Sequence, residues 1–195
     1  MLTINKITSF EHVINKSTFI CTLFPITNLE DANAILKEVR KKYYDATHNC
    51  YACIYGDNGE YAKNSDDGEP SQTAGIVIYD VLRKNNLTNV LAVVTRYFGG
   101  IKLGAGGLVR AYSSSTAEAV KIAELIKIEK KTKIVIKVSY NNFNTLSKII
   151  DDLWITNKNF TDIIILECDI PNDLLDDFNT KAKDITKNQI QIEIK

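Results

Sequence analysis

The chain has 195 residues, of which 45% are hydrophobic and 25% charged, and its formal net charge is zero. This composition excludes a disordered chain, and it excludes a polycation that binds nucleic acid strongly without regard to sequence. There is no apolar run long enough for a membrane span and no signal peptide at the start, and the four cysteines do not make a disulfide framework, so we expect a cytoplasmic protein without membrane contact.

The first two thirds of the chain alternate between strands and helices. Thr27 and Glu30 have the spacing of a capping box and predict a helix start, and the stretch VLAVV at 90–94 is apolar throughout, as is typical of a central strand. The expected elements are, in chain order, a strand at 17–26, a helix from about Leu29 to Val39, a strand at 48–55, a polar loop at 56–70, a helix from about Ala74 to Leu82, a strand at 90–94 and a helix at about 105–125.

The last third contains no glycine, because all nine glycines lie between Gly56 and Gly107. Its pattern predicts strands at 133–140, 162–170 and 189–194, with helices around 143–150 and after Pro171, and a short hairpin strand at 154–158 would complete the set. The order strand, helix, strand, strand, helix, strand is the ferredoxin-like βαββαβ arrangement. We therefore predict an α+β protein of two domains, residues 1–125 and 126–195.

The segment TRYFGGIKLGAGGLVRAY, residues 95 to 112, places five glycines and two arginines between a buried strand and a helix. It is not a P-loop, since Ala105 and Gly106 stand where Lys and Ser or Thr are required, and its glycine spacing does not fit a Rossmann motif. A helix start presents free N–H groups and a positive dipole end, which predicts a phosphate site, with two aromatic rings nearby for stacking on bases. The candidate ligand-binding residues are Arg96, Tyr97, Phe98, Gly99, Gly100, Lys102, Gly104, Gly106, Gly107 and Arg110. The alternative is that the glycines serve only a tight turn and close packing.

A second candidate site combines the acidic loop SDDGEPSQTAG, residues 65 to 75, with a histidine from an earlier strand. Carboxylates just before a helix complement its dipole, and this explanation is favoured over a divalent-metal site because the spacing is not that of an EF-hand. The candidate residues are His48, Asp66, Asp67 and Glu69.

The segment THNCYAC, residues 47 to 53, does not form a metal or redox site by its pattern. On a strand, Cys50 and Cys53 point to opposite faces, whereas His48 and Cys50 share a face and favour a packed or hydrogen-bonded pair over a catalytic dyad. We therefore predict neither a metal nor a cofactor.

Four motifs together resemble the Impact family, in its bacterial YigZ branch. They are RYFGGIKLGAGGLVRAY, SDDGEPSQTAG, THNCYA and NKSTFI. The resemblance implies an N-terminal Impact domain of the left-handed βαβ type found in a ribosomal protein and in elongation factor G, followed by a ferredoxin-like domain similar to the last domain of that factor. Two positions depart from the family pattern: Gln72 stands where glycine is usual, and Thr18 where a basic residue is common.

These implied folds belong to translation, and fold likeness carries function only by analogy. The leading hypothesis is a non-enzymatic, translation-associated regulator that binds RNA or the ribosome through the glycine-rich loop. Two alternatives stay open. One is an enzyme for a small phosphorylated substrate, with His48 or the carboxylates as acid–base or metal groups, and the other is a protein–protein interaction module.

Overall fold

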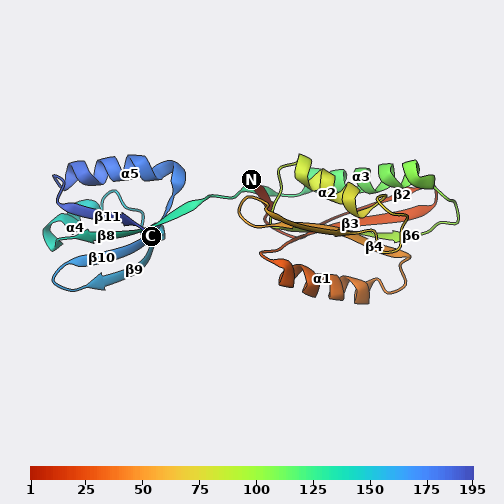
Figure 1. Cartoon of the computed structure of the whole chain (residues 1–195), viewed down its shortest axis with the longest axis horizontal. Coiled ribbons are helices and arrows are strands. Elements are labelled where there is room, and N and C mark those ends of the chain that lie inside the picture. The colour runs from red at the N-terminus through yellow and green to blue at the C-terminus, as the bar shows by residue number, and fades with distance from the viewer. The chain divides into compact units, whose positions relative to one another are not determined.

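A computed structural model describes all 195 residues, Met1–Lys195, as a mixed α+β protein (Figure 1). The chain divides into two compact units, Met1–Ile128 and Glu129–Lys195, which are described separately below. None of the helices combines the length and the apolarity that a membrane crossing requires.

The first unit is built on a five-stranded antiparallel sheet with the strand order β2-β3-β6-β4-β5. Its strands are β2 (Thr8–Ile14), β3 (Ser17–Pro25), β4 (His48–Tyr55), β5 (Tyr61–Ser65) and β6 (Val90–Tyr97). A second, two-stranded sheet pairs β1 (Leu2–Ile4) with β7 (Leu125–Lys127), so that the two ends of this unit lie side by side.

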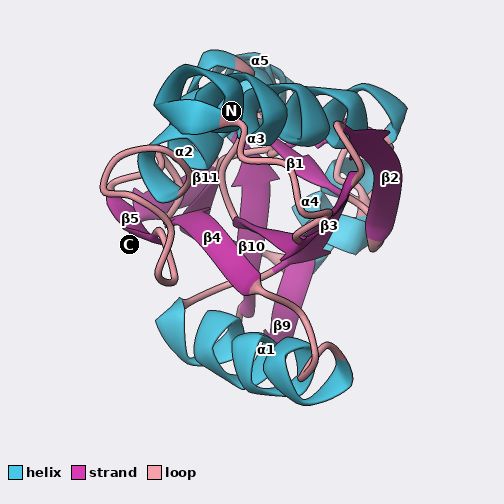
Figure 2. Cartoon of the chain, turned by 90° about the vertical axis from the view of Figure 1, so that its right-hand side faces the viewer, coloured by secondary structure: helices cyan, strands magenta, loops and turns pink.

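Helices cover both faces of the five-stranded sheet. α1 (Leu29–Lys42) lies on one face, while α2 (Gly75–Lys84) and α3 (Gly104–Ile122) lie on the other, as Figures 1 and 2 both show. The central strand β6 is buried on both faces, which confirms the strand expected at 90–94. Cys50 contributes to the core under α2 and α3, and Cys53 to the core under α1, so the two thiols point to opposite faces as predicted.

The predicted capping box at the start of α1 is wrong by one residue. Asn28 is the N-cap, and its side-chain oxygen accepts a 2.9 Å hydrogen bond from the N–H of Asp31. Thr27 instead donates its hydroxyl to the Asp31 carboxylate at 2.6 Å. Asp31, and not Glu30 as predicted, is thus the acidic residue of the first turn whose side chain binds back to the residues before the helix.

The loop expected at 56–70 contains a strand, β5. Most β5 side chains are exposed, and the strand is held by backbone pairing to β4 at the edge of the sheet. Edge pairing requires no apolar residues, so the polar sequence YAKNS gave no strand signal.

The second unit follows the predicted order of elements. Its four-stranded antiparallel sheet has the order β11-β8-β10-β9, and its apolar core joins this sheet to both helices. The elements are β8 (Lys131–Val138), α4 (Tyr140–Leu146), the short 3₁₀ helix η1 (Asp152–Trp154), β9 (Ile155–Phe160), β10 (Ile164–Pro171), α5 (Asn172–Ile185) and β11 (Ile190–Ile194).

Candidate functional site

A hollow of about 430 Å³ lies where the end of β6 and the start of α3 meet the acidic loop that precedes α2. We call it the α3 pocket, and its polar, aromatic and glycine lining includes His48, Glu69, Arg96, Phe98, Lys102 and Gly104. The two candidate sites of the sequence analysis therefore share one pocket. They meet because β4 and β6 are neighbouring strands, with His48 paired directly with Arg96.

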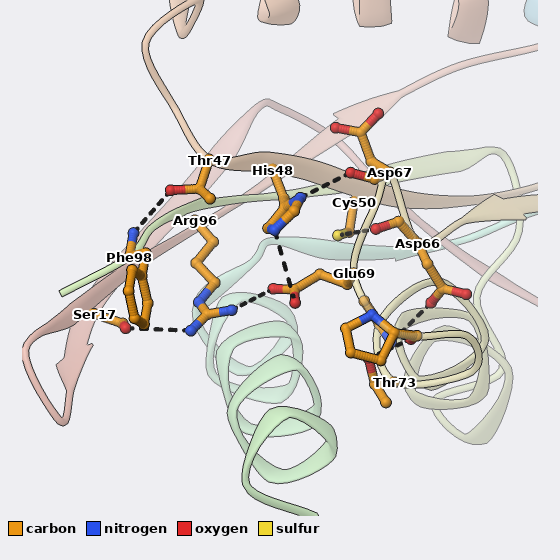
Figure 3. A network of polar contacts seen from close by, with 12 residues as sticks. Ser17, Thr47, His48, Cys50, Asp66, Asp67, Glu69, Thr73, Arg96 and Phe98 are labelled. Atoms are coloured by element: carbon orange, nitrogen blue, oxygen red, sulfur yellow. Dashed lines mark hydrogen bonds and ion pairs between the residues drawn. The ribbon is translucent and has the colours of Figure 1, made fainter. Parts of the chain in front are cut away.

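Arg96 forms a buried wall of the α3 pocket. Its Nη1 donates to Glu69 Oε1 at 2.6 Å, and its Nη2 lies 3.4 Å from Ser17 Oγ (Figure 3). The guanidinium also stands over the Phe19 and Phe98 rings, 5.4 and 5.5 Å from their centroids. Its Nε is buried without a hydrogen-bond partner. The side chain is thus fixed in direction and keeps one unused donor.

Glu69 is the buried counter-ion of Arg96. Its side chain is only 3% exposed, Oε1 accepts a second hydrogen bond from Tyr112 Oη at 2.8 Å, and Oε2 lies 3.8 Å from His48 Nε2. Burial, together with Cys50 and Glu69 as neighbours, raises the pKa of Tyr112, so the phenol stays a hydrogen-bond donor. The expectation that Glu69 complements a helix dipole is therefore wrong, since the carboxylate instead compensates a buried guanidinium.

Asp66 is the residue of the acidic loop that supports the start of α2. Its carboxylate accepts hydrogen bonds of 2.9, 2.9 and 2.8 Å from the backbone N–H groups of Gln72, Ala74 and Gly75. Burial alone would raise the pKa of Asp66, but these backbone hydrogen bonds outweigh it and the pKa is lowered. Asp67 instead accepts from the N–H of Asn49 at 2.7 Å and pairs with Arg40.

His48 and Cys50 contact two consecutive backbone carbonyls of the acidic loop. His48 Nδ1 lies 2.8 Å from the carbonyl oxygen of Asp67 and must donate to it, because a carbonyl only accepts. The other ring nitrogen, Nε2, points toward Glu69, 3.8 Å from its Oε2 (Figure 3). Cys50 Sγ donates to the carbonyl of Asp66 at 2.9 Å, and burial raises the pKa of this thiol to about 12, which makes it unreactive.

The glycines of the segment 95–112 have different structural roles. Gly99 stands against the β2–β3 turn, where a Cβ would overlap the carbonyl of Lys16. Gly100 and Gly104 have positive φ values of 84° and 69°. Gly107 lies close to Leu103, since a Cβ at position 107 would lie 3.0 Å from Leu103 Cβ. A Cβ at Gly106, in contrast, would meet no atom within 4 Å.

No side chain at the start of α3 caps its free N–H groups or balances the positive end of its dipole. Its N-cap residue is Leu103, which makes no side-chain capping hydrogen bond, and no acidic residue stands in the first turn. Gly104, Ala105 and Gly106 are exposed. This end of the helix can therefore accept an anion from outside the chain.

Eight predicted site residues do not line the α3 pocket, namely Tyr97, Gly99, Gly100, Gly106, Gly107, Arg110, Asp66 and Asp67. Tyr97 donates its hydroxyl to Asp45 at 3.0 Å, on the other side of the strand from Arg96 and Phe98. Arg110 is exposed and lines a different hollow on α3. Arg110, a candidate ligand-binding residue of the glycine-rich segment, is therefore not part of the α3 pocket.

The family profile described as the Impact N-terminal domain matches residues 15–120, which is more than half of the chain. The chain belongs to the Impact family. All residues of the α3 pocket lie within the matched Impact segment. The resemblance stated from the motifs, including the YigZ branch, is confirmed.

Relatives extend the likeness beyond the Impact N-terminal segment. IMPACT family member YvyE of Bacillus subtilis is 42% identical over 151 residues, which cover 77% of this chain and 68% of that protein. IMPACT family member YigZ of Escherichia coli is 31% identical over 183 residues, or 92% and 90% of the two chains. A crystal structure of a hypothetical protein matches with a TM-score of 0.70 at 28% identity and covers 98% of this chain and 95% of its own.

The α3 pocket also depends on two residues that were not among the predicted site residues. Ser17 and Tyr112 hold Arg96 and Glu69 from β3 and α3, but each looks like an ordinary member of a strand or helix pattern, and only long-range contact reveals it. No cluster of three or more His, Cys, Asp or Glu side chains in the structure has the arrangement of a metal site.

Proposed function

We propose that this Impact protein is a translation-associated regulator that binds RNA through the α3 pocket. One observation carries the proposal: a buried arginine, an exposed lysine, an uncapped helix start and an exposed aromatic ring meet in one hollow. The first three groups bind phosphate, and Phe98, which is 46% exposed, offers a ring on which a base stacks. The family resemblance supports the translational setting.

The charge balance of the α3 pocket favours modest affinity. Because Glu69 compensates Arg96, the attraction for a phosphate comes mainly from Lys102 and the start of α3. With one phosphate bound in the pocket, the affinity for single-stranded RNA falls with salt with a logarithmic slope of about 0.7 for that contact.

Fluorescence anisotropy with labelled single-stranded RNA at several salt concentrations tests the proposal. Lys102→Ala and Phe98→Ala change exposed residues and should leave the fold intact, while each weakens binding by about fivefold to tenfold. Lys121→Ala, at the far end of α3, removes the same charge and serves as the control. RNA affinity that is equal in wild type, Lys102→Ala and Phe98→Ala would sink the proposal.

A second candidate function is that of an enzyme for a small phosphorylated substrate. The observation that favours it is the direction of His48, whose Nδ1–H is held by a carbonyl so that Nε2 faces the pocket as an acid–base group beside Glu69. Thermal-shift screening with phosphorylated metabolites, followed by turnover assays of wild type and His48→Gln, tests this candidate. No shift across the panel counts against it.

The finer fold assignments are also part of the proposal. The βαββαβ order of Glu129–Lys195 supports a ferredoxin-like fold, and the β3–α1–β4 connection supports the left-handed βαβ assignment through the family resemblance. Four cysteines that are buried and free of disulfides support a cytoplasmic setting.

A further inference from the structure

A second hollow, of about 560 Å³, lies beside the α3 pocket on the outer side of α3. It is formed between the β2–β3 turn and the first three turns of the helix, and we call it the Arg110 hollow. Its lining includes Asn15, Leu103, Gly107, Arg110 and Ser113. Arg110 is the single charged residue of this lining, which contains no carboxylate, so the hollow attracts anions.

The two hollows flank the first turn of α3. Leu103 lines both of them. Gly104 and Ala105 line the α3 pocket, Gly107 lines the Arg110 hollow, and Gly106 stands between them in the chain. Gly106 is exposed in this first turn and lies one helical turn before Arg110, so it offers an open surface for a ligand that extends from one hollow to the other.

Nothing in the structure of the chain requires glycine at position 106. Its φ is not positive, and an added Cβ would meet no atom of the chain within 4 Å. Glycine is the least favourable non-proline residue in a helix, so alanine would serve the fold better at this exposed position. The missing side chain leaves room for something that comes from outside the chain.

We propose that one strand of RNA crosses α3 at Gly106, with one phosphate in the α3 pocket and another in the Arg110 hollow. Arg110 then contacts the second phosphate, assisted by the Ser113 hydroxyl, and the glycine lets the sugar–phosphate backbone approach the helix closely. The proposal rests on the RNA-binding function proposed above, and it makes the ligand a polynucleotide rather than a single nucleotide. A phosphate-bearing metabolite fills only the α3 pocket.

Binding of uridine 5′-monophosphate and of oligouridylates of increasing length, at several salt concentrations, tests this crossing. Arg110→Ala should weaken oligouridylate binding by about tenfold, as for one charge-assisted hydrogen bond, and lower the salt slope by about 0.7, while binding of the mononucleotide stays unchanged. Lys121→Ala removes the same charge at the other end of α3 and should change neither the affinity for oligouridylates nor the salt slope.

Gly106→Ala gives an independent readout that separates an effect on stability from an effect on ligand binding. This variant should have a higher Tm than wild type, because alanine favours the helix, and a lower affinity for oligouridylates. An affinity that stays equal to wild type would overturn the role of Gly106.

The failures of the two proposals are distinguishable. Affinity independent of oligonucleotide length, or equal effects of Arg110→Ala and Lys121→Ala, overturns the crossing while Lys102-dependent binding still stands. Absence of any RNA binding overturns the proposed function together with the crossing.

Discussion

Replacement of Glu69 by glutamine tests how far the buried ion pair supports the first unit. The side chains of Arg96 and Glu69 are 6% and 3% exposed, and their closest contact is 2.6 Å. Glutamine keeps the shape of glutamate but removes its charge, so Arg96 would remain buried without a counter-ion. Removing one partner of a buried pair costs about 3–5 kcal/mol, and we expect the unfolding free energy of the first unit to fall by about this amount.

Urea unfolding followed by far-UV circular dichroism measures the change. A typical urea dependence of about 2 kcal/mol per molar converts the loss into a midpoint shift of about 1.5–2.5 M. The only tryptophan, Trp154, lies in the second unit, so its fluorescence serves as an internal control and should keep its midpoint. Exposed Asp57 provides the matched control, since Asp57→Asn should change the free energy by less than about 0.5 kcal/mol.

A loss below about 1 kcal/mol in Glu69→Gln would refute the reasoning, because it would mean that the guanidinium is solvated or finds other partners. A Trp154 midpoint that moves together with the first unit would refute the assignment of the loss to the pocket.

Three further predictions concern the loops around the pocket. Gly99→Ala should destabilise the first unit by about 3 kcal/mol, because its Cβ would overlap the carbonyl of Lys16; an unchanged Tm would contradict this close approach. Gln72→Gly should raise the unfolding free energy by about 0.5–1 kcal/mol, since Gln72 has φ of 64°, whereas Gln72→Ala keeps the strain and should show no such gain in urea unfolding. Asp66→Asn should cost about 1–2 kcal/mol at neutral pH. Because the pKa of Asp66 is lowered in the fold, its contribution is complete above the ordinary pKa of 3.8 and is lost as pH falls through the pKa of the folded state. The difference between wild type and variant should therefore shrink below pH 3.8 in a pH series of urea unfolding.

The sequence was sufficient to predict the elements whose buried residues follow a clear pattern along the chain. β6 is apolar throughout because both of its faces are covered, and the strands of the second unit alternate because one face packs on a core. The edge strand β5, the strand β2 beside the turn at Lys16 and the short pair β1–β7 escaped prediction. Their stability comes from backbone pairing with distant strands, which leaves little trace in side-chain pattern.

The candidate site was predictable in some of its members but not in its arrangement. The glycine and acidic motifs each identified residues of the pocket, whereas their convergence depends on the pairing of β4 with β6. The partner of Arg96 could not be foreseen, because Glu69 is 27 residues away and an acidic loop ordinarily faces water. That Arg110 lines a separate hollow could not be foreseen either, since helical spacing alone does not tell which neighbouring turn closes a hollow.

The acidic loop is held at several points, among them the bonds from the backbone at the start of α2 to Asp66 and the ion pair of Glu69 with Arg96. One wall of the pocket is therefore rigid before any ligand arrives. Association then needs no slow rearrangement, so stopped-flow traces should show a single phase whose rate rises linearly with ligand concentration.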